Sequence, residues 1–192
     1  MRLAMALLAV LVPLSTGGAA TLTVDCDGGG DFLTVQSAVD AADIGDTLVI
    51  SSCVYTESVD ASEKGLSFVG EGAATTRIEF SGSEPTLRAL HSDYVQTSVT
   101  GLSVVNDGAG PAVRWTKQLR LDSCNISGLL EGDIWGTPGH HVSLDADACS
   151  LNEVYIWGGG ISHVTGCTFS SLEVAGYFEY MNTSGHTLCT NS

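Results

Sequence analysis

The spacing of apolar residues changes near the start of the chain and is typical of strands thereafter. Residues 3–14 are apolar throughout except for a proline. Four apolar residues then recur at the spacing of one helical face: Val35, Ala38, Val39 and Ala42. Thr34 is a suitable N-cap, and Gly45 stands where a helix ends. The pattern predicts a short apolar leader and one helix after Thr34, with strands in the rest of the chain.

The predicted strands are short runs of apolar residues separated by Gly, Ser, Asn and Asp. They are Thr21–Asp25, Asp46–Ile50, Leu66–Val69, Thr76–Phe80, Val99–Val105, Ala112–Trp115, Leu119–Leu121, His141–Leu144, Glu153–Trp157, Ile161–Val164 and Val174–Phe178. Many short strands and only one helix indicate an all-β fold.

A four-residue signature recurs every 18 to 25 residues. It reads small, apolar or Cys, polar, apolar, and occurs at Gly101–Val104, Ser123–Ile126, Ala148–Leu151 and Gly166–Phe169. This period fits one coil of a β-solenoid better than a sandwich. Because residues two apart share a face of a strand, the second and fourth positions of each signature should point inward.

The first 20 residues have the features of a cleaved signal peptide. Arg2 precedes the apolar run, and small residues at 18–20 suit a signal-peptidase site. The run is shorter than the ~20 residues needed to span a bilayer, which disfavours the alternative of a membrane anchor. We therefore expect residues 21–192 to form a single domain that is secreted or periplasmic, with no transmembrane segment.

Charge restricts the partners that we expect. The formal net charge is −15, and no lysine or arginine follows Arg120. Nucleic-acid binding is disfavoured because phosphate contacts require clustered cations. Capture of polyuronates is disfavoured because the negative charge of the chain repels their carboxylates, whereas neutral glycans remain candidates.

Six cysteines follow the leader, an even number that is compatible with disulfides in an exported chain. Cys26 and Cys53 lie one coil apart and are the favoured pair, since neighbouring coils stack at ~4.8 Å. The other four should line one inward stripe, either as bridges between adjacent coils or as free buried thiols: Cys124, Cys149, Cys167 and Cys189.

Several stretches carry a resemblance to a known family. They are GGGDFLTVQSAVDAADIGDTLVIS, CVYTESVDASEKGLSFVGEG, TTRIEF and SVTGLSVVN. In this order they resemble the opening of right-handed parallel β-helix proteins of the pectin lyase-like superfamily, and the first is similar to the start of pectin methylesterases. The resemblance covers residues 22–171. It implies a right-handed parallel β-helix with an N-terminal capping helix.

The resemblance also supplies candidate catalytic residues. The segment 130–136 is similar to one that carries a pectin methylesterase aspartate, here Asp133. The segment 138–144 is similar to the Gly-His-Gly loop of polygalacturonases, and the segment 122–124 to their paired aspartates. Asp122 or Asp133 would then be an acid or base, and His140 a substrate contact.

The catalytic motifs of these families are incomplete in this chain. Ser123 stands where polygalacturonases have their second aspartate, and residues 110–115 replace the Gln-Asp-Thr segment of pectin methylesterases. Their later Arg-Pro-Trp segment is absent. These departures predict a protein without pectin-degrading activity.

Two further sets of residues are candidates for binding. Aromatic rings suited to stacking on sugars, or alternatively to covering coil faces, are Trp115, Trp135, Tyr155 and Trp157. Asp25, Asp27 and Asp31 offer carboxylates for Ca²⁺, but no bidentate Glu completes the set, which favours a solvated turn. We expect no other cofactor.

Two classes of function remain open. The first is a non-catalytic extracellular module that binds a glycan or a cell-surface polymer, with self-association as a further candidate. The second is a polysaccharide-acting esterase, hydrolase or lyase with a degenerate site. A cluster of at least two carboxylates within ~10 Å would favour the enzyme.

Overall fold

The computed structural model describes residues 18–91, 95–132, 142–157, 160–175 and 183–184. The first elements are β1 (Thr21–Val24), α1 (Val35–Ala41), β2 (Thr47–Ile50), β3 (Val54–Thr56), β4 (Val59–Asp60), β5 (Ser67–Gly70), β6 (Arg77–Phe80), β7 (Leu87–Ala89) and β8 (Gln96–Thr100). Then follow β9 (Ser103–Asn106), β10 (Val113–Trp115), β11 (Gln118–Asp122), β12 (Asn125–Gly132), β13 (Ser143–Asp147), β14 (Ser150–Trp157), β15 (Gly160–Thr165), β16 (Thr168–Ala175) and β17 (Thr183–Ser184). Strand β1 begins one residue after the predicted signal-peptide cleavage site.

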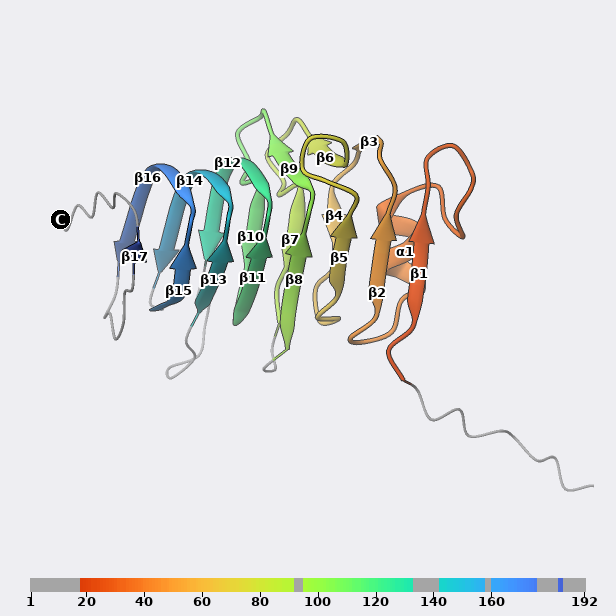
Figure 1. The fold of residues 1–192 in the computed structure, drawn as a ribbon, viewed down its shortest axis with the longest axis horizontal. Helices are drawn as coiled ribbons and strands as arrows, with labels where there is room; N and C mark the ends of the chain where they lie inside the picture. Colours follow the sequence, from red (N-terminus) through yellow and green to blue (C-terminus); the bar gives the residue numbers. More distant parts are fainter. Residues whose placement is uncertain (1–17, 92–94, 133–141, 158–159, 176–182, 185–192) are drawn as a thin grey trace, which may run out of the picture.

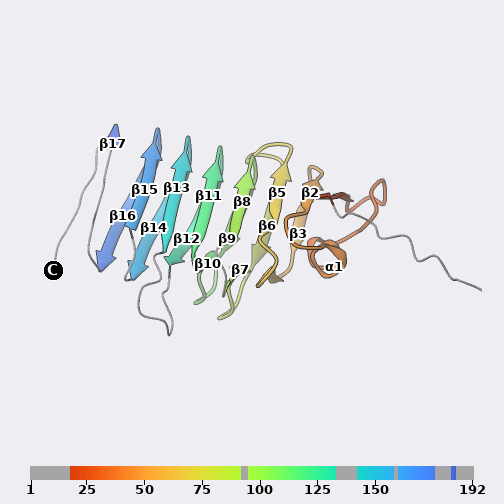
Figure 2. The same cartoon turned by 90° about the horizontal axis from the view of Figure 1, so that it is seen from below.

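All strands pair in parallel, and successive coils stack along one axis (Figures 1 and 2). Sheet A has the order β1-β2-β5-β8-β11-β13-β15-β17. In sheet B, the series β3-β6-β9 and β4-β7-β10 both pair with the long strand β12, which is followed by β14 and β16. The predicted all-β, parallel β-helix fold is confirmed.

The core is built from columns of apolar side chains, one from each coil. In sheet A, paired positions place six buried side chains in one column: Leu48, Phe68, Val99, Leu121, Ala146 and Val164. A column from the second half of sheet B runs through Val59, Leu87, Val113, Leu130, Val154 and Leu172. Each coil therefore buries its apolar side chains against those of the coils above and below it.

The repeated signature forms the corner between the two sheets. The expected single strand Val99–Val105 is wrong, because the chain turns at Gly101 and divides it into β8 and β9. At this corner the four coils that carry the signature each have a residue with left-handed backbone, with φ of 63° at Gly101, 55° at Ser123, 52° at Ala148 and 64° at Gly166. The next residue points into the core, as predicted. Cys124 and Cys149 are buried there, and Cys167 is half-buried.

The left-handed corners give a paired stability prediction. Ala148→Gly should raise the free energy of unfolding by about 0.5–1 kcal/mol, since glycine removes the strain of a Cβ at positive φ at a smaller entropic cost. Gly166→Ala should lower the free energy of unfolding by a similar amount, because a Cβ strains the backbone at positive φ. Backbone strain would act alone there, since the added Cβ would have its nearest neighbour at 3.6 Å and meet no clash. Urea unfolding measures both changes, and equal midpoints for the two variants would contradict this account of the corner.

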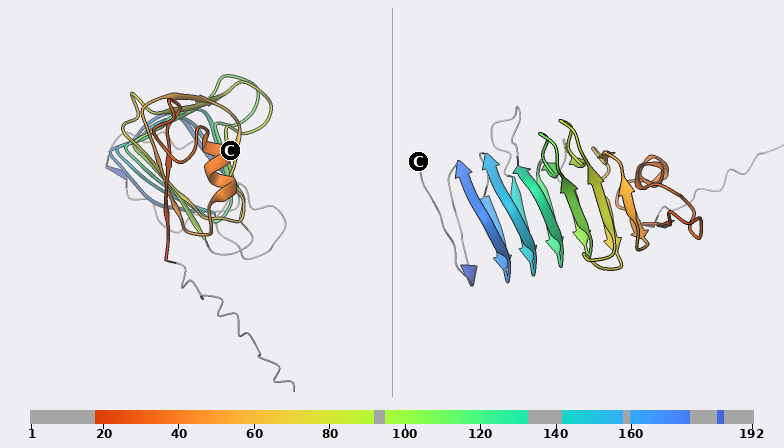
Figure 3. Two further views of the ribbon diagram at one scale, coloured as in Figure 1. Left: turned by 90° about the vertical axis from the view of Figure 1, so that its right-hand side faces the viewer. Right: turned by 90° about the horizontal axis from the view of Figure 1, so that it is seen from above.

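Helix α1 lies across the end of the first coils (Figure 3, left). Val35, Ala38 and Val39 are buried against the core, and the Thr34 side chain accepts a hydrogen bond from the Ser37 amide, as its predicted N-cap role requires. An open solenoid end would expose apolar side chains and unpaired strand edges. The helix covers this end.

Two charged side chains from the next coil hold the helix at both termini. The Glu57 carboxylate accepts hydrogen bonds from the Val35 and Gln36 amides at 2.8 and 2.9 Å. The Lys64 ammonium donates to the carbonyls of Val39 and Ala42 at 2.6 and 2.9 Å, and to a third carbonyl between them. The anion at the N-terminus and the cation at the C-terminus both match the helix dipole.

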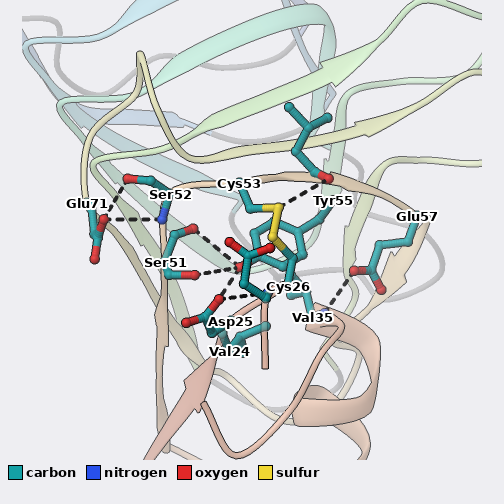
Figure 4. Close-up of a disulfide and its surroundings, with 12 residues drawn as sticks. Val24, Asp25, Cys26, Val35, Ser51, Ser52, Cys53, Tyr55, Glu57 and Glu71 are labelled. Carbon is teal, nitrogen blue, oxygen red and sulfur yellow. Dashed lines mark hydrogen bonds between the residues drawn. A yellow bond between two sulfur atoms is a disulfide. The ribbon is translucent and has the colours of Figure 1, made fainter. Parts of the chain in front are cut away.

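The predicted Cys26–Cys53 disulfide is confirmed and lies beside this cap (Figure 4). The buried Tyr55 hydroxyl is 3.3 Å from the carbonyls of Val24 and Ser51 and so ties the first coil to the second. Tyr55 and Glu57 belong to the second of the stretches that resemble the opening of pectin lyase-like β-helix proteins. In this chain both residues act in building the cap.

The role of Glu57 in holding the helix can be tested with one conservative change. Glu57→Gln should lower the free energy of unfolding by about 1–2 kcal/mol, because two amides lose a charged acceptor. The control is Glu71→Gln, since Glu71 accepts hydrogen bonds from Ser52 on the surface and does not contact the helix. Equal urea midpoints for the two variants would show that Glu57 has no special role.

Candidate functional site

One row of outward-facing side chains crosses the second half of sheet B. Its members occupy paired positions on successive strands: Asp60, Arg88, Arg114, Glu131, Tyr155 and Glu173. Each follows a buried residue of the core column, so the alternation of a strand places it outside. We call these six residues the outer row.

Ion pairs occupy the first four positions of the outer row. Arg88 contacts Asp60 at 3.6 Å and also pairs with Glu84. The Arg114 guanidinium lies 3.2 Å from the Glu131 carboxylate, and both side chains are about one-third exposed. Glu131 is therefore partly desolvated and neutralised by a cation.

An exposed aromatic pair follows the ion pairs. Tyr155 and Trp157 lie two residues apart on the same face of β14, and the Trp157 indole N–H donates to the Tyr155 hydroxyl. Trp157 is 53% exposed, whereas Tyr155 is half-buried. A tryptophan held by its polar edge presents an apolar ring to solvent, which suits stacking against a flat apolar ligand surface.

An open polar groove lies along the first half of the same strands, β12, β14 and β16. Its volume is about 350 Å³. It is lined by Asn125, Ser127, Ser150, Asn152, Thr168 and Ser170, with apolar contributions from Ile126, Leu151 and Phe169. None of these lining residues is charged. The groove offers neutral hydrogen-bond donors and acceptors at the regular spacing of the coils.

The strands bend between the groove and the aromatic pair. Gly128 has a φ of 115°, and the pairing of β12 with β14 shifts between Ile126 and Leu129. A residue with a Cβ is strained at this φ, which explains a glycine at the bend. Strand β14 thus carries Asn152 in the groove and Tyr155 in the outer row.

The structure corrects one of the predicted binding residues. Trp115 is fully buried in the core and cannot stack on a glycan. In β10 it shares the inward face with Val113, so it fills the interior. Tyr155 and Trp157 lie on the surface as a binding role requires, whereas Trp135 falls outside the described residues.

The candidate catalytic residues are not brought together in the described part of the chain. Asp133 and His140 lie outside it. Asp122 is on the outer face of sheet A, and its carboxylate accepts a hydrogen bond from the Ser123 hydroxyl. Asp122 stands opposite Asp147 on the neighbouring strand. These two adjacent carboxylates lie on a different sheet from Tyr155 and the polar groove.

The predicted calcium ligands separate into two groups. Asp31 accepts hydrogen bonds from the Thr23 hydroxyl and amide at 2.7 and 3.0 Å, which lower its pKa. Asp25 and Asp27 lie together beside Cys26, but the Cys26 sulfur is in a disulfide, and Asp25 accepts a hydrogen bond from the Asp27 amide. These contacts are those of a structural turn.

Comparison with known proteins gives the fold but no family assignment. No family model and no curated protein matches this sequence. Among solved structures, pectin methylesterase from carrot has a TM-score of 0.57 and 17% identity over 88% of this chain and 65% of that one. Pectin methylesterase from Erwinia chrysanthemi has a TM-score of 0.48 and 12% identity, over 83% of this chain and 55% of that one.

This chain thus spans about two-thirds of the carrot enzyme and about half of the bacterial one. The similarity confirms the resemblance to pectin lyase-like β-helix proteins at the level of fold. Within the described residues, no helix is long and apolar enough to cross a membrane.

Proposed function

We propose that this protein is an exported β-helix that binds a neutral glycan on the outer face of sheet B without cleaving it. The observation that carries the proposal is the Tyr155–Trp157 pair on the same strands as an uncharged polar groove. Sugars have apolar ring faces and hydroxyl rims, and these two surfaces match the two features. Export rests on the leader sequence.

Charge supports a neutral ligand over a uronate. Glu131 and Glu173 flank Tyr155 in the outer row, and the whole chain carries a net charge of −15. Arg114 is engaged by Glu131 at 3.2 Å. A polyanion that approached Trp157 would therefore meet carboxylates first.

The prediction for binding concerns Trp157. Trp157→Ala should weaken binding to a soluble neutral oligosaccharide by about tenfold or more, since stacking on an exposed ring is removed. Tyr155→Phe is the matched control, because it keeps both rings and removes only the hydroxyl that holds the indole. We expect it to have a smaller effect. Isothermal titration against a panel of neutral oligosaccharides and oligogalacturonates measures both.

Two results of that titration would contradict the proposal. The first is unchanged affinity in Trp157→Ala for any glycan that the wild-type protein binds. The second is preferential binding of oligogalacturonates over the neutral ligands.

A hydrolytic enzyme is the second candidate, and one observation favours it. Glu131 and Glu173 occupy the same outer row two strands apart, with backbones separated by ~9.6 Å. The two carboxyl groups of inverting glycosidases stand ~6.5–9.5 Å apart, which two glutamate side chains on backbones at this spacing can reach.

The enzyme alternative has its own test. Purified protein at high concentration should release neither reducing ends nor methanol from pectins and neutral glycans. Activity that is lost in both Glu131→Gln and Glu173→Gln, but kept in Asp122→Asn, would replace the binding proposal with the enzyme.

A further inference from the structure

Three free cysteines are stacked in consecutive coils at the corner between the sheets. Cys124 and Cys149 are buried, and Cys167 is half-buried. Asp122 pairs with Asp147 and Asn125 with Ser150, so Cys124 stands directly opposite Cys149. The pairs that flank Cys149 and Cys167 place these two opposite each other in the same way. We call these three residues the thiol ladder.

The sulfurs lie between the coils. The Cys124 amide donates to the Cys149 sulfur at 3.5 Å, and the Cys149 amide donates to the Cys167 sulfur at 3.3 Å. Each thiol also donates to the carbonyl two residues earlier, at 3.1 to 3.3 Å. The Cys149 and Cys167 sulfurs are each directed at the cysteine of the preceding coil, whereas the Cys124 sulfur is directed at the Val99 carbonyl of the coil before it.

Neighbours in the thiol ladder are within reach of a disulfide. Paired residues on adjacent parallel strands have Cα atoms ~4.8 Å apart, inside the ~4.4–6.8 Å range of disulfides. The Cys167 sulfur already lies beside Cys149, so one side-chain rotation of Cys149 brings the two sulfurs together. Cys124 and Cys167 are two coils apart, at ~9.6 Å, and cannot bond.

Chemistry singles out Cys167 as the thiol that reacts first. It is the most exposed of the three, and the neighbouring Cys149 thiol lowers the pKa of Cys167 to about 7. The neighbouring Cys124 and Cys167 thiols, together with burial, raise the pKa of Cys149. The thiolate is the nucleophile in disulfide exchange, so an accessible thiolate lies next to a protonated, buried partner.

We propose that Cys149 and Cys167 form a redox-active pair, which a low-molecular-weight disulfide such as oxidised glutathione converts into a second disulfide between coils. The Cys167 thiolate attacks one sulfur of the small disulfide, whose S–S bond breaks and releases one thiol. Cys149 then loses its proton to solvent and attacks the Cys167 sulfur, which releases the second thiol. Two protein thiols are oxidised, and one small disulfide is reduced to two thiols.

The new bond would join two coils near the C-terminal end of the described chain. Cys26–Cys53 already joins two coils at the opposite end. Cys124 has no partner left once Cys149 is bonded, so it stays a thiol. Oxidation thus has a defined product with one bridge and one free ladder cysteine.

The experiment uses the full mature chain with Cys189→Ser, which removes the cysteine outside the described residues. The protein is incubated with oxidised glutathione, denatured, alkylated without reduction and digested with a protease that cuts after glutamate. Glu131 and Glu153 separate the three ladder cysteines into different peptides. We expect a linked peptide pair with Cys149 and Cys167, and alkylated Cys124.

Two further variants distinguish a Cys149–Cys167 bridge from one that involves Cys124. Cys124→Ser should form the same bridge at an unchanged rate. Cys149→Ser should stop at a glutathione adduct on Cys167, because no second thiol is in reach. If Cys149→Ser does not fold, the peptide map of the parent chain and the Cys124→Ser variant still decide the matter. Three alkylated thiols in the parent chain, or a Cys124–Cys149 bridge as the main product, would overturn the proposal.

The pH dependence of the first step is a separate prediction. Because the pKa of Cys167 is lowered to about 7, its thiolate predominates above that pH and its thiol below it. Alkylation of Cys167 in the folded protein should therefore rise through a midpoint near pH 7, and a midpoint at the usual value near 9 would contradict it. Mass spectrometry of the Cys167 peptide after short pulses of iodoacetamide gives the rates.

Discussion

Parallel pairing between coils is the constraint on which the whole structure depends. Every strand obtains its backbone partners and its apolar contacts from the coil above and the coil below, so no coil is stable alone. The first coil lacks one neighbour, and α1 takes that place. Glu57 and Lys64 hold the two ends of this helix from the next coil, and the Cys26–Cys53 bond lies beside it. The segment that most resembles pectin methylesterases is thus explained by the need to seal the end of the solenoid.

The same register that builds the core also places the functional side chains. Inward positions of sheet B are apolar, as in the column from Val113 to Leu130 and Val154. Outward positions are under no such constraint, and there Arg114, Glu131 and Tyr155 stand side by side. In this row Arg114 holds the Glu131 carboxylate beside Tyr155, whose hydroxyl accepts a hydrogen bond from the exposed Trp157. The likeness to pectin methylesterase is shown at the level of the fold.

Features set by local sequence could be predicted, and features set by contacts between coils could not. Helix α1 was predictable because its buried residues recur at helical spacing, and the inward positions of the signature were predictable because the signature repeats. The Cys26–Cys53 bond followed from a separation of one coil. The contacts of Glu57 and Lys64 with the helix were missed, since they join residues 21 to 25 positions apart whose approach depends on the cap.

Two sequence-based predictions were wrong for simple physical reasons. The run Val99–Val105 read as one strand because the left-handed turn at Gly101 leaves both halves apolar. Trp115 was kept as a candidate for stacking on sugars although alternation with Val113 places it inside, and the same reasoning would have put Arg114 on the outer face. Glu131 was not among the predicted site residues, although its position directly after the inward Leu130 was the signal that it faces outward.

Hydroxyl-radical footprinting tests the central claim, that ligands bind the outer face of sheet B around Tyr155 and Trp157. Both rings react readily with the radical, and each reports its own exposure. With a saturating neutral oligosaccharide, the account predicts that oxidation of Trp157 falls several-fold while that of the exposed His163 on sheet A is unchanged. Unchanged oxidation of Trp157 together with protection of His163 would place the ligand on the other sheet and contradict the account.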